Sequence, residues 1–276
     1  MPEPAAPSAV EIVRLLDVMR RLRDPETGCP WDIEQTFATI APYTIEEAYE
    51  VADAIAEADM PALREELGDL LLQVAYHAQI ATEGGAFDFA AVARAIADKM
   101  IARHPHVFGD AEITGATAQT LAWEARKAEE RAAKAASAGR RASMLDGIAT
   151  ALPALTRAEK LQKRAARVGF DWTEASRVLD KIEEEIAEVR AEIDAGSGTD
   201  RFEDEVGDLL FATANLARHL KIDGEAALRR ANAKFEKRFR AIETRLAAQG
   251  RAAGDCSLDE LEALWQSVKR SEASGD

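Results

Sequence analysis

The sequence predicts an all-α protein, and three observations lead to that prediction. Ala, Leu, Glu and Arg dominate the composition, and these residues are strong helix formers. Apolar residues recur at intervals of three and four through most of the chain, which is the helical period, and no segment alternates as a strand would. With 276 residues, of which 47% are hydrophobic, the chain is long enough for two modest domains, each with its own core.

The first helix is expected to carry an apolar stripe between Ile12 and Leu22. Ser8 and Glu11 have the spacing of a capping box at its start. The stretch from Asp24 to Thr44 contains three prolines and one glycine, which break helices. We therefore expect an ordered loop with a short turn after the first helix.

Three more helices are expected in the first half of the chain. Thr44 and Glu47 have capping-box spacing and predict the start of the second helix. Pro61 opens the third, which ends at Gly84 and Gly85, because proline favours a first turn and glycine a helix end. The fourth is predicted over residues 89–103.

The second half of the chain repeats the first. Ile45–Val51 resembles Glu183–Val189, and Glu66–Leu71 resembles Glu205–Leu210. The offsets are 138 and 139 residues, so the order and the spacing of the segments are both kept. Such self-similarity predicts a tandem repeat of one helical bundle domain.

The boundary between the two copies is expected in a stretch that is almost entirely Ala, Lys, Arg, Glu, Ser and Gly. Its composition suits the solvated end of a helix followed by a linker, and its charges are explained by a wet surface. The predicted parts are an N-terminal domain over residues 1–127, a linker over residues 128–143 and a C-terminal domain over residues 144–276.

Four carboxylates of the second copy are predicted to converge. Residues three apart share a helical face, and an antiparallel pair of helices would bring two such faces together. Close, half-buried carboxylates repel one another and need a compensating cation, and hard oxygen ligands suit Mg²⁺ or Mn²⁺. The predicted metal ligands are Glu185, Glu188, Glu205 and Asp208, with Glu47, Glu50, Glu66 and Asp69 as the equivalent set of the first copy.

A simpler interpretation is that such acidic residues are only solvated. Two observations favour the metal site. Asp208 lies in an apolar stretch with Leu209 and Leu210, and the whole set recurs in both halves.

Cations precede the carboxylates of the second copy. Lys181 and Arg201 each lie one turn before a pair, where they would meet phosphate oxygens, although ordinary salt bridges within a helix are the alternative. Two more candidates, one turn apart on a later helix, are Lys234 and Arg238. In the first copy Tyr43 and Ala62 take the places of Lys181 and Arg201, so we expect the triphosphate site in the second copy.

With EExxE followed by ExxD on consecutive helices, twice over, the chain resembles the MazG family of all-α nucleoside triphosphate pyrophosphohydrolases. Further matching segments are Gly28–Asp32, His104–Phe108, Val168–Trp172 and Lys234–Phe239, and the likeness covers residues 8–272. The resemblance implies Mg²⁺-dependent cleavage of nucleoside triphosphates between the α- and β-phosphates, which gives monophosphate and pyrophosphate; which nucleotide is preferred is left open. It also implies a homodimer whose bundles are completed across the subunit interface.

The resemblance also assigns residues to the nucleotide. Those expected to line its site are Lys181, Glu184, Arg201, Lys234, Arg238 and Trp265. Glu184 flanks the ligand face, so we expect it to orient or deprotonate the attacking water. A core or interface position is an equally good interpretation for Trp265. The first copy keeps Glu46 with its four carboxylates, and its role is left open between turnover of other nucleotides and building the dimer.

Other protein classes fit less well. A net charge of −15 disfavours nucleic-acid binding, and the longest stretch without charged residues, Leu70–Thr82, is too short to span a membrane. Two cysteines and an N-terminus unlike a signal peptide suggest the cytoplasm. No histidine follows a glutamate by three residues, as a ferritin-like di-iron site requires. A non-catalytic nucleotide-binding sensor or a helical interaction protein remains the alternative.

Overall fold

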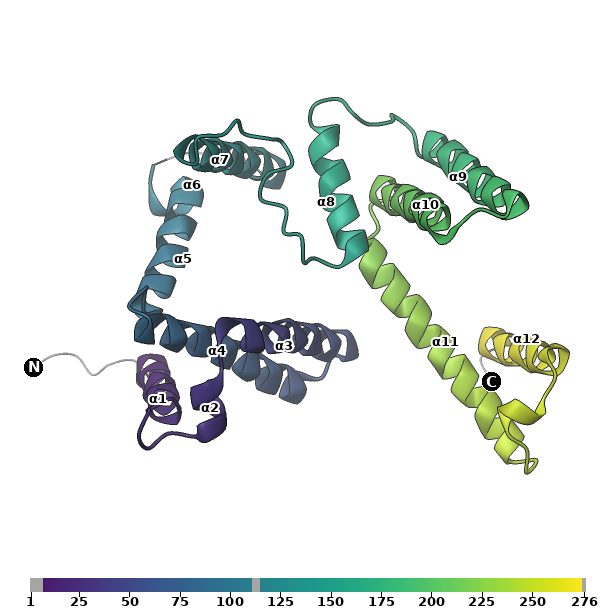
Figure 1. Cartoon of the computed structure of the whole chain (residues 1–276), viewed down its shortest axis with the longest axis horizontal. Helices are drawn as coiled ribbons and strands as arrows, with labels where there is room; N and C mark the ends of the chain where they lie inside the picture. The colour runs from purple at the N-terminus through teal and green to yellow at the C-terminus, as the bar shows by residue number, and fades with distance from the viewer. Residues whose placement is uncertain (1–6, 111–114, 275–276) are drawn as a thin grey trace, which may run out of the picture. The chain divides into compact units, whose positions relative to one another are not determined.

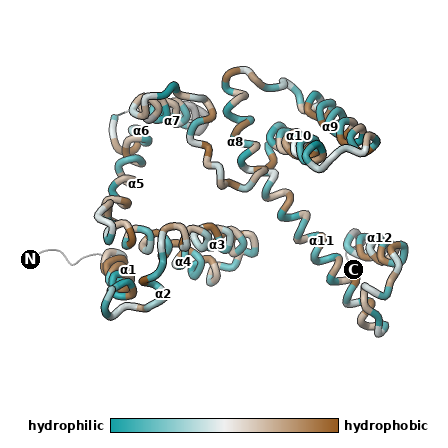
Figure 2. The backbone as a smooth tube through the Cα atoms, viewed as in Figure 1, coloured by the Kyte–Doolittle hydropathy of each residue, from teal (hydrophilic) through white to brown (hydrophobic). Residues whose placement is uncertain are grey.

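The computed structural model describes residues 7–110 and 115–274 (Figure 1). Helices are the regular elements of these residues, and no strand occurs among them, which confirms the predicted all-α class. The chain divides into two compact units, Met1–Arg126 and Lys127–Asp276. Apolar and polar residues are interspersed along the helices of both units, as expected for helices with one buried face (Figure 2).

The first unit is built around a helical hairpin. Its helices are α1 (Pro7–Leu22), α2 (Pro30–Glu34), α3 (Phe37–Glu57), α4 (Met60–Glu83), α5 (Phe89–Arg103), α6 (Pro105–Phe108) and the start of α7 (Ala116–Ser137). α3 packs along α4, and α1 packs against α4 (Figure 1). The core joins Met19 of α1, Ile40 of α3 and Tyr76 of α4.

Two predicted helix starts in this unit are wrong. α3 begins at Phe37, because Thr36 and Thr39 form a reciprocal capping box ahead of it. Thr44 therefore lies inside the helix and is not its cap, and the helix continues through Pro42 with the loss of one backbone hydrogen bond. α1 already includes Pro7, so Ser8 is in its first turn and does not cap it.

The second unit repeats the hairpin. After the end of α7 come α8 (Ala154–Ala166), α9 (Ala175–Ala195), α10 (Thr199–His219), α11 (Gly224–Ala247), the 3-10 turn η1 (Ala253–Asp255) and α12 (Leu258–Ser274). α9 packs along α10, α8 packs against α10, and α12 packs on α11 through Ile242, Leu246 and Val268. Within the described ranges, no helix is both long and apolar enough to cross a membrane.

The two hairpins turn at equivalent positions. α3 ends at Ala58 with φ of 57°, and α9 ends at Gly196 with φ of 62°, so both residues adopt the left-handed conformation. Glycine adopts it without strain and alanine does not. Short connections follow, Ala58 and Asp59 in the first copy and residues 196–198 in the second, so the second helix of each pair runs back along the first.

Candidate active site

The hairpin of the second unit brings three carboxylates together. Glu185 on α9, and Glu205 and Asp208 on α10, each offer an oxygen, and these atoms lie within 4.8 Å of one another. Glu185 is only 3% exposed, Glu205 is partly buried and Asp208 is exposed. A buried, charged carboxylate next to two other carboxylates destabilises the fold unless a cation neutralises the negative charge.

The two oxygens of Glu185 have different surroundings. Oε1 lies 2.8 Å from the ammonium nitrogen of Lys181. Oε2 is buried and has no hydrogen-bond partner in the part of the chain that the structure describes. An orphaned carboxylate oxygen beside two further carboxylates is the hard donor set that Mg²⁺ or Mn²⁺ prefers, so the residues present fit a divalent cation.

Glu188 extends this cluster along α9. Partial desolvation, followed by the neighbouring carboxyl of Glu185, raises the pKa of Glu188 above its usual range, and Lys181 acts in the opposite direction. Glu188 is exposed and is not one of the three residues whose oxygens meet.

Lys181 and Arg201 form the salt bridges that helical spacing allows. Lys181 pairs with Glu184 and Glu185, both at 2.8 Å, and these two hydrogen bonds, Glu184 first, raise the pKa of Lys181. Arg201 pairs with Glu192 at 2.6 Å and with Glu205 at 3.1 Å. Both cations thus lie against the predicted ligands, and their contact with phosphate stays a prediction.

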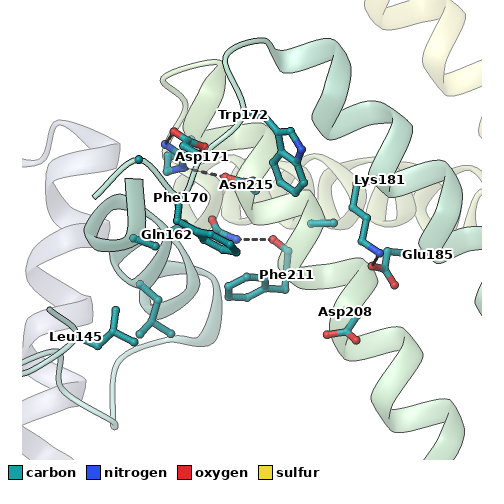
Figure 3. Close-up of a pocket in the computed structure, with 15 residues that line it drawn as sticks. Leu145, Gln162, Phe170, Asp171, Trp172, Lys181, Glu185, Asp208, Phe211 and Asn215 are labelled. Atoms are coloured by element: carbon teal, nitrogen blue, oxygen red, sulfur yellow. Dashed lines mark hydrogen bonds and ion pairs between the residues drawn. The ribbon is translucent and has the colours of Figure 1, made fainter. Parts of the chain in front are cut away.

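A cavity of about 710 Å³ adjoins the carboxylates (Figure 3). Its volume is within the usual range of small-molecule sites. Lys181, Glu185 and Asp208 line it on one side. The remaining lining includes aromatic rings and amides, namely Phe170, Trp172, Phe211, Gln162 and Asn215.

The loop between α8 and α9 is fastened to α10 at this cavity. Arg218 donates to both oxygens of Asp171, one at 2.9 Å, and His219 lies 3.0 Å from the same carboxylate. Burial alone would raise the pKa of Asp171, but the hydrogen bonds from Arg218 and His219 lower it. These bonds hold the loop that carries Phe170 and Trp172 beside the cavity.

Three predicted nucleotide residues lie elsewhere in the second unit. Lys234 and Arg238 are on α11 and Trp265 is on α12. The guanidinium of Arg238 lies 5.6 Å from the centre of the Trp265 ring and pairs with Glu272 at 2.7 Å. None of these residues is among those that line the cavity.

The first unit contains a corresponding cluster. Glu47 on α3, and Glu66 and Asp69 on α4, offer oxygens within 4.8 Å of one another. Desolvation and then Asp69 raise the pKa of Glu47, while desolvation and then Glu50 raise that of Glu66. The amide of Gln73 donates to Glu47 at 3.3 Å, and Glu46 is exposed.

Sequence reasoning named the carboxylates but missed the cavity. Gln162 and Asn215 were not singled out, because they belong to different helices and no spacing pattern connects them. The Val168–Trp172 segment was identified as a match to the family, but not as part of a cavity. Together, the fold and the site define a helical protein that presents carboxylates for a hard cation beside a small-molecule cavity.

Comparisons with known proteins assign the chain to a particular family of this class. The family model for the MazG nucleotide pyrophosphohydrolase domain matches residues 35–108 and again residues 173–242. A nucleoside triphosphate pyrophosphohydrolase of Escherichia coli strain K12 is 55% identical over 95% of this chain and 98% of its own length.

Two further relatives extend the comparison. One of Thermotoga maritima, named nucleoside triphosphate pyrophosphohydrolase/pyrophosphatase MazG, is 42% identical over 92% of this chain and 94% of its own length. The protein YabN of Bacillus subtilis is 41% identical over 92% of this chain and 51% of its own length. The chain belongs to the MazG nucleotide pyrophosphohydrolase family, which confirms the predicted tandem repeat and the predicted hydrolase class.

Proposed function

We propose that the C-terminal copy is the site at which this chain hydrolyses nucleoside triphosphates, including ATP and dATP, to monophosphate and pyrophosphate. One observation carries the proposal. The buried carboxylate of Glu185, with Oε2 lacking a partner among the described residues, lies beside Glu205 and Asp208 and borders the cavity. A triphosphate that shares a cation with these carboxylates would have the rest of the nucleotide next to the cavity.

Glu185, Glu188, Glu205 and Asp208 would hold the cation, Mg²⁺ or Mn²⁺. When bound, the cation neutralises phosphate charge and activates water for attack. Lys181 and Arg201 lie against the same carboxylates, so their charges are already positioned where phosphate oxygens would arrive.

Glu184 would orient or deprotonate the attacking water. Its side chain is 58% exposed, and it pairs with Lys181 at 2.8 Å, as Glu185 does. Replacing Glu184 with Gln should lower kcat by about 100-fold and change KM little, because a general base acts on the chemical step. Glu183→Gln, an exposed neighbour on α9, is the matched control. A near-normal kcat for E184Q would assign the role to another residue.

A homodimer would complete the site. Two observations support it: the second unit leaves large apolar side chains exposed, among them Ile193, Leu210 and Phe235, and Arg238 and Trp265 are not among the residues that line the cavity. Mixing inactive Glu188→Gln chains with inactive Arg238→Ala chains should restore about a quarter of wild-type activity if each site uses both subunits. No restoration in mixed dimers would mean that each chain supplies its own site.

Pyrophosphate release tests the function itself. Wild-type protein with ATP or dATP and Mg²⁺ should release pyrophosphate, and chelation should stop it. Glu188→Gln should remove this activity, and the equivalent Glu50→Gln of the first copy should leave most of it. Nucleotide binding without pyrophosphate release would favour the alternative of a non-catalytic sensor.

We also propose a cellular compartment and a class of ligand for the protein. Cys29 and Cys256 are free thiols, which suits the reducing cytoplasm. The net charge of −15 disfavours nucleic acid as a partner. We therefore expect a cytoplasmic enzyme whose ligand is a mononucleotide.

A further inference from the structure

We propose that the cavity beside the carboxylates binds the nucleobase, and that Oε1 of Gln162 accepts a hydrogen bond from an exocyclic amino group such as those of adenine and cytosine. This inference rests on the proposed function, because the triphosphate at the carboxylates sets where the base would lie. It makes Gln162 a residue that determines specificity. No contact with the reacting phosphates is implied.

The orientation of the Gln162 amide is fixed by its neighbour. Gln162 lies on α8 and is 8% exposed, and its Nε2 donates to the backbone carbonyl of Phe211 at 2.8 Å (Figure 3). A carbonyl only accepts hydrogen bonds, so the amide nitrogen has to face α10. Oε1 is then the group left over, and within the described residues it is buried without a hydrogen-bond partner.

A buried acceptor without a donor is costly, and folded proteins seldom tolerate one without a reason. Because Gln162 lines the cavity, a ligand there can supply the missing donor. Asn215 presents a second amide to the same cavity, and its Oδ1 is held by Nε of Arg218 at 2.9 Å. The polar lining on this side is therefore fixed in position before any ligand arrives.

The walls of the cavity suit a flat heterocycle. Phe170, Trp172 and Phe211 contribute aromatic rings, and Leu145 and Leu161 add apolar contacts. Stacking on aromatic side chains is a common way to bind a nucleobase, whichever base it is. Figure 3 shows Phe170, Phe211 and Leu145 on one side, with Lys181, Glu185 and Asp208 on the other. The base and the phosphates of one nucleotide would thus occupy opposite ends of a continuous site.

The first copy has larger side chains at two positions equivalent to the cavity lining. The offset of 139 residues places Tyr76 at the position of Asn215, and Gln73 at the position of Ala212. Tyr76 is buried in the core, and its hydroxyl donates to the Asp32 carboxylate at 3.0 Å. Smaller side chains at residues 212 and 215 leave room next to the carboxylates of the second copy.

The test compares ATP with purine riboside triphosphate, which lacks only the 6-amino group. In the full-length wild-type protein, the loss of this donor should raise KM about tenfold, because the acceptor stays buried and unpaired. Gln162→Met keeps the side-chain volume and removes the acceptor. For this variant KM should differ less than about twofold between the two substrates. Inhibition by inorganic tripolyphosphate, which has no base, should be unchanged.

Two further variants separate recognition from damage to the fold. Val178→Ala loosens a fully buried position of α9 that does not line the cavity, so it should keep the wild-type preference for ATP. Asn215→Tyr transfers the ring of the first copy into the cavity and should raise KM for ATP about tenfold or more. An Asn215→Tyr protein with an unchanged KM for ATP would contradict a base in this cavity.

Equilibrium binding of adenosine and of purine riboside reads the base site without hydrolysis. A failure of the proposed function would appear as no pyrophosphate release from any nucleotide, while these nucleosides would still be distinguished. The inference about Gln162 is overturned if the wild-type protein treats adenosine and purine riboside alike, or if Gln162→Met keeps the preference.

Discussion

The two copies of the helical hairpin contain the same carboxylates in different surroundings. In each copy three carboxylate oxygens lie within 4.8 Å of one another, across two helices joined by a short turn. In the second copy Lys181 and Arg201 pair with the carboxylates, whereas Tyr43 and Ala62 hold these places in the first. The hairpin therefore brings the same carboxylates together in both copies, and under the proposed function the residues around them set whether a triphosphate binds.

The space next to the carboxylates differs in the same way. Tyr76 of the first copy is part of the core, and burial followed by its hydrogen bond to Asp32 raises the pKa of Tyr76 to about 12. Asn215 takes the equivalent position in the second copy and lines the cavity. One helical register thus yields a packed core in one copy and room for a ligand in the other.

The largest expected difference between the copies is in catalysis. Glu185→Gln should reduce pyrophosphate release by about 1000-fold, because it removes a ligand whose charge the cation needs. The matched Glu47→Gln should reduce it less than about threefold if turnover belongs to the second copy. Both are measured as kcat/KM for ATP. Equal losses in the two variants would assign turnover to both copies and end the proposed division of roles.

Arginines that fasten a loop to the hairpin should matter for stability in both copies. Arg218→Ala removes a partner from Asp171, whose side chain is 24% exposed. Arg23→Ala removes a partner of Glu83 and the donor to the backbone carbonyls of Asp32 and Gln35. Each should cost about 2–3 kcal/mol in its own unit, read from urea unfolding.

Only one of these two variants should affect the substrate. Arg218→Ala should also raise KM, because Phe170 and Trp172 lose their support, while Arg23→Ala should leave KM unchanged. A higher KM in the Arg23 variant would show that the two units are coupled.

The turns of the two hairpins offer a smaller, paired test. Ala58→Gly should stabilise the first unit by about 0.5–1 kcal/mol, because glycine adopts a positive φ without strain. Gly196→Ala should destabilise the second unit by about 1 kcal/mol for the same reason, and no atom lies within 4 Å of an added Cβ there. Shifts of the same sign in thermal unfolding would contradict the equivalence of the two turns.

The smallest expected effect is a pH dependence of the metal-free protein. The pKa values of Glu47, Glu66 and Glu188 are raised in the folded state, so between the usual value of 4.5 and the raised values the folded chain binds more protons than the unfolded chain. The contribution of these groups to the free energy of unfolding therefore falls as pH rises through that window. It rises again when the pH is lowered to about 4.5. The pH dependence should be weaker in Glu50→Gln, because the charge of Glu50 contributes to the raised pKa values of Glu47 and Glu66.

Divalent cation should reverse this trend, because it binds the ionised carboxylates. Thermal unfolding with and without Mg²⁺ should therefore show a larger stabilisation at about pH 8 than at about pH 5. Equal stabilisation at both values would mean that Mg²⁺ binds elsewhere.

The parts of the fold that could be predicted are those set by local spacing. Glu185 with Glu188, and Glu205 with Asp208, share helical faces whatever surrounds them, and an antiparallel pair of helices predicted that the two faces meet. The start of α3 could not be predicted in the same way, since Thr36 competes with Thr44 as a cap and Pro42 argues against a helix there.

The cavity could not be predicted because its lining comes from different elements. Gln162 is on α8, Trp172 is in a loop and Asn215 is on α10, and only the packing of the three brings them together. The positions of Lys234 and Arg238 had the same difficulty. Their one-turn spacing was visible, but which surface α11 presents depends on tertiary and subunit contacts.

Whether Glu185, Glu205 and Asp208 hold a divalent cation decides most of what is proposed here. The most direct measurement is anomalous scattering from Mn²⁺ in crystals of the full chain with a non-hydrolysable ATP analogue. A Mn²⁺ peak should lie about 2.0–2.3 Å from oxygens of these three residues and from phosphate oxygens. Bound nucleotide with no Mn²⁺ at this cluster, or with the three side chains turned apart, would contradict the assignment.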